Sequence, residues 1–118
     1  MVLTTKTQDG VVVVYLAGAI LFGEESEPLR ILIKHLLRKS RQIVLDFGKA
    51  SHIDSGGVGN LVAAYASARR VGGEIKFANL GNHAKDVLRT TNLVTVFEIF
   101  DKTEDAVASF HKALELFD

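Results

Sequence analysis

The chain has 118 residues, 47% of them hydrophobic, and its 14 basic and 14 acidic side chains balance to a formal net charge of +0. This length predicts a single domain over residues 1–118, and the charge balance argues against nucleic acid as the main partner, because neutralising phosphates needs a basic surplus. The chain has no cysteine, which excludes disulfides, thiolate zinc sites and cysteine nucleophiles.

No apolar run reaches the ~20 residues of a membrane span, so no direct membrane insertion is expected. The first residues lack the basic start and apolar stretch of a signal peptide. We therefore expect a cytoplasmic protein.

The N-terminal part is predicted to form a hairpin followed by a helix. Residues 4–8 form a marginal polar strand, and the dipeptide Asp9-Gly10 tolerates the positive φ of a tight turn. Residues 11–16 form a β-branched strand of the kind that is buried on both faces of a sheet. Leucine and isoleucine then recur at helical spacing between positions 29 and 37, which predicts an amphipathic helix.

The remaining elements alternate between strands and helices. Strands are predicted over residues 43–47, 74–80 and 96–100, and helices from Ser55 to the stop at Gly72, over 82–89, and from a cap at Thr103. The order ββαβαβαβα indicates the α/β class. It predicts a mostly parallel central sheet with an N-terminal antiparallel hairpin and about four helices.

The stretch HIDSGGVGNL, residues 52–61, was tested against three loop types that bind nucleotides or carry a nucleophile. A dinucleotide-binding loop needs its third glycine where Val62 stands, and nine residues separate Phe47 from the first glycine of that pattern, too many for a tight strand-to-helix turn. A P-loop needs a lysine after the glycines, and a hydrolase elbow needs a glycine at Ile53. None of the three patterns is met.

The histidines do not predict a catalytic or metal site either. His52, Asp54 and Ser55 are sequence neighbours, whereas a catalytic triad is assembled from distant segments. The three other histidines form no H-E-x-x-H or similar ligand pair. We therefore predict no catalytic residue, no metal ligand and no cofactor.

The start of a helix explains about half of the residue pattern in this stretch. Asp54 or Ser55 can accept hydrogen bonds from the free amides of the following helix. Gly56, Gly57 and Gly59 would let its first turn pack closely against the sheet, yet each glycine inside a helix costs up to ~1 kcal/mol relative to alanine. A partner surface that approaches the helix closely is the simplest explanation for glycines at these positions despite that cost.

Along nearly its whole length the chain resembles a known family. The likeness is carried by residues 14–20, 43–47, the loop Asp54-Ser55-Gly56-Gly57-Val58-Gly59, and residues 64–76, 78–80, 87–88, 91–93 and 96–97. These segments resemble the STAS domain of bacterial anti-sigma factor antagonists.

The resemblance implies a partner-switching mechanism. An antagonist of this kind binds an anti-sigma factor, which is also a serine kinase of the histidine-kinase-like ATPase fold, and thereby frees a sigma factor for transcription. The kinase then phosphorylates the antagonist at the start of the helix, and the complex separates. The resemblance makes the loop from Asp54 to Gly59 the partner-binding and regulatory segment.

This chain departs from the family motif, D-S-[ST]-G-[LIV]-G, at the residue that accepts the phosphate. That position is Gly56, which has no hydroxyl, and Ser55 matches the preceding serine, which is generally not the acceptor. A second departure is Leu21, where many members carry an aspartate. The protein either binds without a phosphorylation switch, or uses Ser55 as a displaced acceptor, or carries an engineered or incidental glycine; we favour the first.

Other roles of STAS domains remain open. A small subunit on the ATPase of a lipid-transporting ABC system, or a component of a stress-sensing scaffold, needs no acceptor hydroxyl. Leu21 and Phe22 are candidates for an additional contact, although a strand end that points into the core explains them at least as well. A nucleotide-binding protein is the weakest alternative, and homodimer formation is left open.

Overall fold

The computed structural model describes residues 1–20 and 27–117, with side chains for residues 1–20 and 28–111. Leu21 and Phe22, the candidates for an additional contact, lie outside the described residues. The elements are β1 (Val2–Gln8), β2 (Val11–Ile20), α1 (Glu27–Leu36), β3 (Gln42–Ile53), α2 (Ser55–Arg70), β4 (Glu74–Ala78), α3 (Asn82–Thr90), the short 3₁₀ helix η2 (Leu93–Thr95), β5 (Ile99–Phe100) and α4 (Thr103–Phe117).

The described strands form a five-stranded sheet in the order β1-β2-β3-β4-β5. Only β1 and β2 are antiparallel, and the other neighbours are parallel. The turn between β1 and β2 places Asp9 at φ 52° and Gly10 at φ 81°, the positive values that a tight two-residue hairpin turn requires. This confirms the predicted α/β fold with its N-terminal hairpin and four α-helices.

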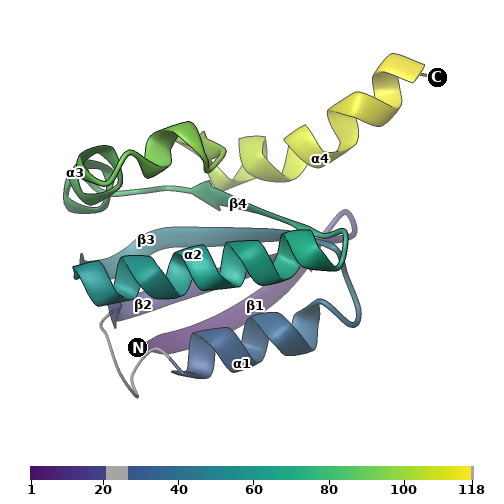
Figure 1. The fold of residues 1–118 in the computed structure, drawn as a ribbon. Coiled ribbons are helices and arrows are strands. Elements are labelled where there is room, and N and C mark those ends of the chain that lie inside the picture. The colour runs from purple at the N-terminus through teal and green to yellow at the C-terminus, as the bar shows by residue number, and fades with distance from the viewer. Residues whose placement is uncertain (21–26, 118) are drawn as a thin grey trace.

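The helices cover the sheet unequally (Figure 1). Val12, Val14 and Leu16 of β2 belong to the core shared with α1 and α2, whereas Val11 and Val13 belong to a second core with α4. Right-handed crossovers that all progress in one direction across a parallel sheet place their helices on the same face. The helix α4 follows the last strand and is therefore able to return over the opposite face.

All five strands differ in length from the prediction: β1, β2 and β3 are longer, and β4 and β5 are shorter. The strand β3 continues to Ile53 because its distal half still pairs with β2, as in Ala17 with Lys49 and Ile20 with Ile53. Asp54 alone then separates it from α2. The prediction that a long loop precedes the glycines was therefore wrong, since pairing with β2 compensates for the polar residues after Phe47.

The final strand is shorter than predicted. Residues 93–95 form the 3₁₀ helix η2, and β5 keeps only Ile99 and Phe100. At the neighbouring strand, Asn79 adopts φ 61°, outside the extended region, so β4 ends at Ala78 and its pairing with β5 ends at Phe100.

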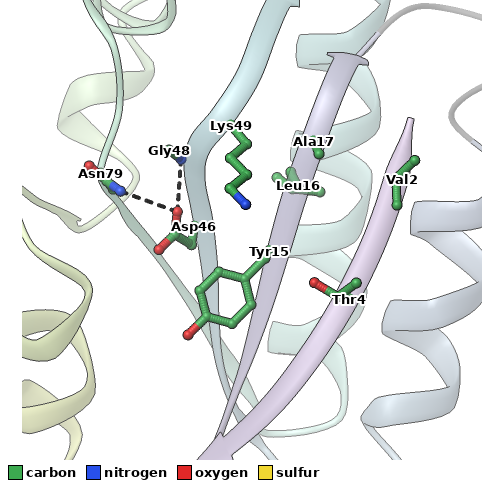
Figure 2. Close-up of a pocket in the computed structure, with 9 residues that line it drawn as sticks. All are labelled: Val2, Thr4, Tyr15, Leu16, Ala17, Asp46, Gly48, Lys49 and Asn79. Carbon is green, nitrogen blue, oxygen red and sulfur yellow. Dashed lines mark hydrogen bonds between the residues drawn. The ribbon is translucent and has the colours of Figure 1, made fainter.

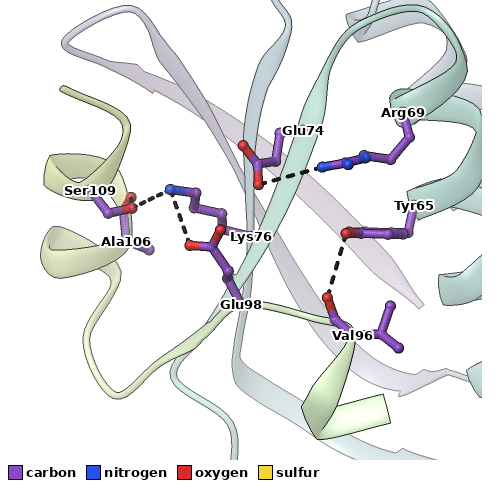
Figure 3. Close-up of polar contacts among 8 residues, drawn as sticks. All are labelled: Tyr65, Arg69, Glu74, Lys76, Val96, Glu98, Ala106 and Ser109. Carbon is purple, nitrogen blue, oxygen red and sulfur yellow. Dashed lines mark hydrogen bonds and ion pairs between the residues drawn. The ribbon is translucent and has the colours of Figure 1, made fainter. Parts of the chain in front are cut away.

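Polar side chains fasten α4 to the sheet. The hydroxyl of Thr103, predicted to cap this helix, instead donates to Oδ2 of the buried Asp46 at 2.5 Å. Lys76, whose side chain is 7% exposed, places Nζ 2.7 Å from Oγ of Ser109 and 3.3 Å from a carboxylate oxygen of Glu98 (Figure 3). The same Nζ lies 4.2 Å from the ring centre of Phe110, a favourable cation–π distance.

Candidate partner-binding site at the start of α2

The candidate site lies where β2 and β3 end and α2 begins. Asp54 has an extended backbone, with φ −99° and ψ 177°, and its Oδ1 accepts a hydrogen bond from the amide of Gly57 at 2.7 Å. The amide of Asp54 also donates to the carbonyl of Ile20 at 3.3 Å, and its carbonyl accepts from the amide of Val58 at 3.0 Å. Asp54 is therefore the N-cap that joins the end of β2 to the first turn of α2.

Two glycines of this turn have opposite surroundings. A β-carbon on Gly57 would overlap the carbonyl oxygen of Ile20, a backbone atom that cannot move without displacing β2. A β-carbon on Gly59 would have nothing within 4 Å. The fold itself thus requires Gly57, whereas no contact within the described molecule requires Gly59.

Apart from the half-exposed cap Asp54, the residues of the predicted loop divide into a buried set and an outer set. Gly57 and Val58 are buried, and Val58 belongs to the core beneath α2. Ser55 and Gly59 are exposed, and Gly56 is half-exposed. We call Ser55, Gly56 and Gly59 the α2 entry surface. It is nearly free of side chains, so that a partner could approach the backbone closely.

Two histidines lie beside this site. The rings of His52 and His83 stack with centres 4.6 Å apart, and Nε2 of His83 lies 3.1 Å from the carbonyl oxygen of Ile53. Sequence reasoning considered these histidines only as ligands or triad members and missed their pairing. The signal was weak, because the pair forms only when β3 reaches Ile53 and α3 begins next to it.

A separate hollow of about 490 Å³ lies on the sheet face away from α1 and α2, with Tyr15 and Lys49 among its lining residues (Figure 2). Its buried carboxylate, Asp46, is already satisfied. Oδ1 accepts from the amide of Gly48 at 2.7 Å and from Nδ2 of Asn79 at 3.4 Å, and Oδ2 accepts from Thr103. Asp46 therefore holds β3, β4 and α4 together.

Neither metal clusters nor membrane-spanning helices were found in the part of the chain that the structure describes. Within it, no group of three or more His, Cys, Asp or Glu side chains could hold a metal ion. No described helix is both long and apolar enough to cross a bilayer.

Comparisons with known proteins identify the family. The sequence model of the STAS domain matches residues 3–106. The chain is 26% identical over 114 residues to BtrV of Bordetella bronchiseptica, which is named as an anti-sigma factor antagonist, and the match covers 97% of this chain and 98% of that protein.

Solved structures agree on the fold. An anti-sigma factor antagonist from Mycobacterium paratuberculosis superimposes with a TM-score of 0.80 at 20% identity, covering 92% of each chain. The Bacillus cell fate determinant SpoIIAA in its phosphorylated form gives a TM-score of 0.70 at 19% identity, covering 92% of this chain and 99% of that one. Because the sequence model spans most of the chain and these structures share its topology, the chain belongs to the STAS domain family.

Proposed function

We propose that this protein is a cytoplasmic regulator of the anti-sigma factor antagonist type. It binds an anti-sigma factor, a serine kinase of the histidine-kinase-like ATPase fold, and so releases a sigma factor. Its relative BtrV, named as an antagonist of this kind, aligns with almost the whole chain. The protein acts by binding and catalyses no reaction of its own.

The observation that carries this proposal is the open space above Gly59. A glycine at position 59, inside α2, lowers the stability of the helix, and no described neighbour explains why a side chain is absent there. A partner that packs directly on the helix backbone does explain it. The Asp54 cap and the buried Gly57 hold this backbone in place before binding, so little conformational entropy is lost when the partner docks.

We further propose that this regulator lacks the phosphorylation switch. Gly56 stands at the family's acceptor position, in the second residue of α2, and has no atom that a kinase could phosphorylate. In relatives with a hydroxyl there, a phosphate adds about −1.5 to −2 charges at the contact surface and opposes binding. Without that charge, release of the partner depends on its concentration and its competing ligands.

The contact is tested by capturing the partner from the source cells and then measuring its binding to purified variants. We expect wild type to recover the kinase-type anti-sigma factor, and Gly59→Trp to weaken binding at least tenfold by filling the open space above the helix. Ala66→Trp is the matched control, because Ala66 is also exposed on α2 but two turns away. Equal binding by the two tryptophan variants would contradict the proposed surface.

The missing switch is tested by incubating the protein with the captured kinase and Mg-ATP. The intact mass of wild type should not change, whereas Gly56→Ser should gain one phosphate. A phosphate on Ser55 of wild type, lost in Ser55→Ala, would show a displaced acceptor instead.

An adaptor subunit on a lipid-transport ABC ATPase is the second candidate, and Gly56 favours it because such a subunit needs no acceptor hydroxyl. A component of a stress-sensing scaffold fits for the same reason. Recovery of a transport ATPase in the capture experiment would replace the antagonist function by this adaptor function. The α2 entry surface would remain the contact to test.

A further inference from the structure

We propose that the layer formed by α1 and α2 is a second contact surface, which receives an acidic segment of the partner protein. This inference rests on the proposed function, since it concerns the same partner. It adds a site at the groove between the two helices, away from the α2 entry surface.

The net charge of zero conceals a strong separation of charges. Residues 28–45 and 55–73 carry seven lysines and arginines and no aspartate or glutamate, while the remaining residues carry seven more cations and all 14 acids. The seven cations of the α1–α2 layer are all exposed: Arg30, Lys34, Arg38, Lys39, Arg41, Arg69 and Arg70. Glu27 begins α1, and a carboxylate oxygen of Glu74 lies 4.0 Å from Nη1 of Arg69, but these two acids leave the layer with a basic surplus.

Tertiary structure brings two basic segments of the sequence together. The sequence has basic runs at residues 38–41 and 69–70, and cations in the last turn of a helix complement the helix dipole. Arg69 and Arg70 do lie in the last turn of α2, but α1 ends at Leu36, before the first run begins. Arg41 of the first run lies beside the turn after α2, because a β-carbon at Gly72, two residues after Arg70, would lie 3.1 Å from its Nη1.

A hollow of about 270 Å³ opens between α1 and α2, which lie side by side (Figure 1). Its lining residues are Arg30, Ile31, Ile33, Lys34, Ala64, Ser67 and Arg70. The small side chains of Ala64 and Ser67 leave the space on the α2 side. Arg30 and Lys34 are one helical turn apart on α1, and Arg70 approaches from α2.

The groove combines this charge with apolar surface. Ile31, which lines the hollow from α1, is 60% exposed. Val62, on the neighbouring helix α2, is 39% exposed. A protein segment with an apolar side chain between two carboxylates complements both features. The two carboxylates would pair with Lys34 and Arg70, which line the hollow from α1 and from α2. Nucleic acid would use the cations but leave Ile31 without a counterpart.

The test is a double charge reversal, Lys34→Glu with Arg70→Glu, measured against the purified partner at low and at moderate salt. We expect affinity to fall at least tenfold at low salt, and the salt dependence of binding to become weaker. Ile31→Ser should weaken binding about threefold to tenfold without changing the salt dependence.

The matched control is Lys6→Glu with Lys102→Glu, which changes the net charge equally. Lys6 pairs with Val13, whose side chain faces α4, and Lys102 immediately precedes α4 and lines a hollow with Tyr15 on that face. Both reversals therefore lie on the opposite side of the sheet. Circular dichroism and thermal melting verify that all variants fold. We expect this control to bind within twofold of wild type.

Three outcomes are distinguishable. If wild type binds no anti-sigma factor, the proposed function itself fails. If Gly59→Trp loses binding while Lys34→Glu/Arg70→Glu equals its control, the proposed function stands and the groove inference is overturned. The inference is also overturned if wild type binds a 20-base-pair DNA duplex or phosphatidylglycerol vesicles as tightly as the partner, because the groove would then serve another polyanion.

Discussion

The two helices α2 and α4 are attached to the same sheet by different means. The start of α2 is held by backbone groups and close packing: a cap from Asp54, and Gly57 against the carbonyl of Ile20. The helix α4 is held by long-range side-chain contacts. Lys76 donates to Ser109 (Figure 3), and Thr103 donates to Asp46. The first attachment holds the proposed contact surface directly against the backbone of β2, whereas the second holds a helix that has no proposed contact.

The largest change in stability is expected from a substitution that disrupts the attachment of α2 to the sheet. Gly57→Ala should lower the free energy of unfolding by about 3 kcal/mol, because its β-carbon would overlap the backbone of Ile20. Urea unfolding followed by circular dichroism measures this.

Gly59→Ala is the matched control, and it should raise stability by up to about 1 kcal/mol, because alanine is the better helix former and the space is open. If both alanine variants changed the free energy of unfolding equally, the structure would not distinguish Gly57, which the fold requires, from Gly59, which we attribute to a partner.

The next largest change in stability is expected from a substitution that disrupts the attachment of α4 to the sheet. Asp46→Ala should cost about 2 kcal/mol, because it leaves the buried hydroxyl of Thr103 and the amide of Gly48 without their acceptor. Hydrogen exchange should increase in the first turn of α4 more than in α2. Uniform acceleration over both helices would mean that the two attachments are not independent.

The smallest changes in stability are expected at the N-cap of α2, where two substitutions test which residue caps the helix. Asp54→Ala should cost about 1 kcal/mol, the usual value for loss of an N-cap acceptor. Ser55→Ala should change stability by a few tenths of a kcal/mol at most, since Ser55 is exposed and Asp54 supplies the cap. Thermal unfolding measures both variants. A larger loss from Ser55 than from Asp54 would overturn the assignment of the cap.

Much of the fold could be predicted because its signals are local. The Asp9-Gly10 turn, the apolar run of β2, the cap at Asp54 and the helix stop near Gly72 each depend on a few adjacent residues. The family resemblance followed from motifs of the same short range. The hairpin, the mostly parallel sheet and the family were therefore accessible from the sequence alone.

What only the tertiary structure decided concerns residues whose role depends on a distant neighbour. Gly57 and Gly59 look alike in the sequence, and only the carbonyl of Ile20 distinguishes them. Thr103 was a plausible cap, but the fold brings its hydroxyl to Asp46, which lies 57 positions earlier in the sequence.

The basic groove likewise exists only because the crossovers place α1 beside α2. Periodicity and capping report the conformation of a segment, because they arise from contacts within a few residues. Packing and charge clustering depend on which segments become neighbours in space, and the sheet topology determines that.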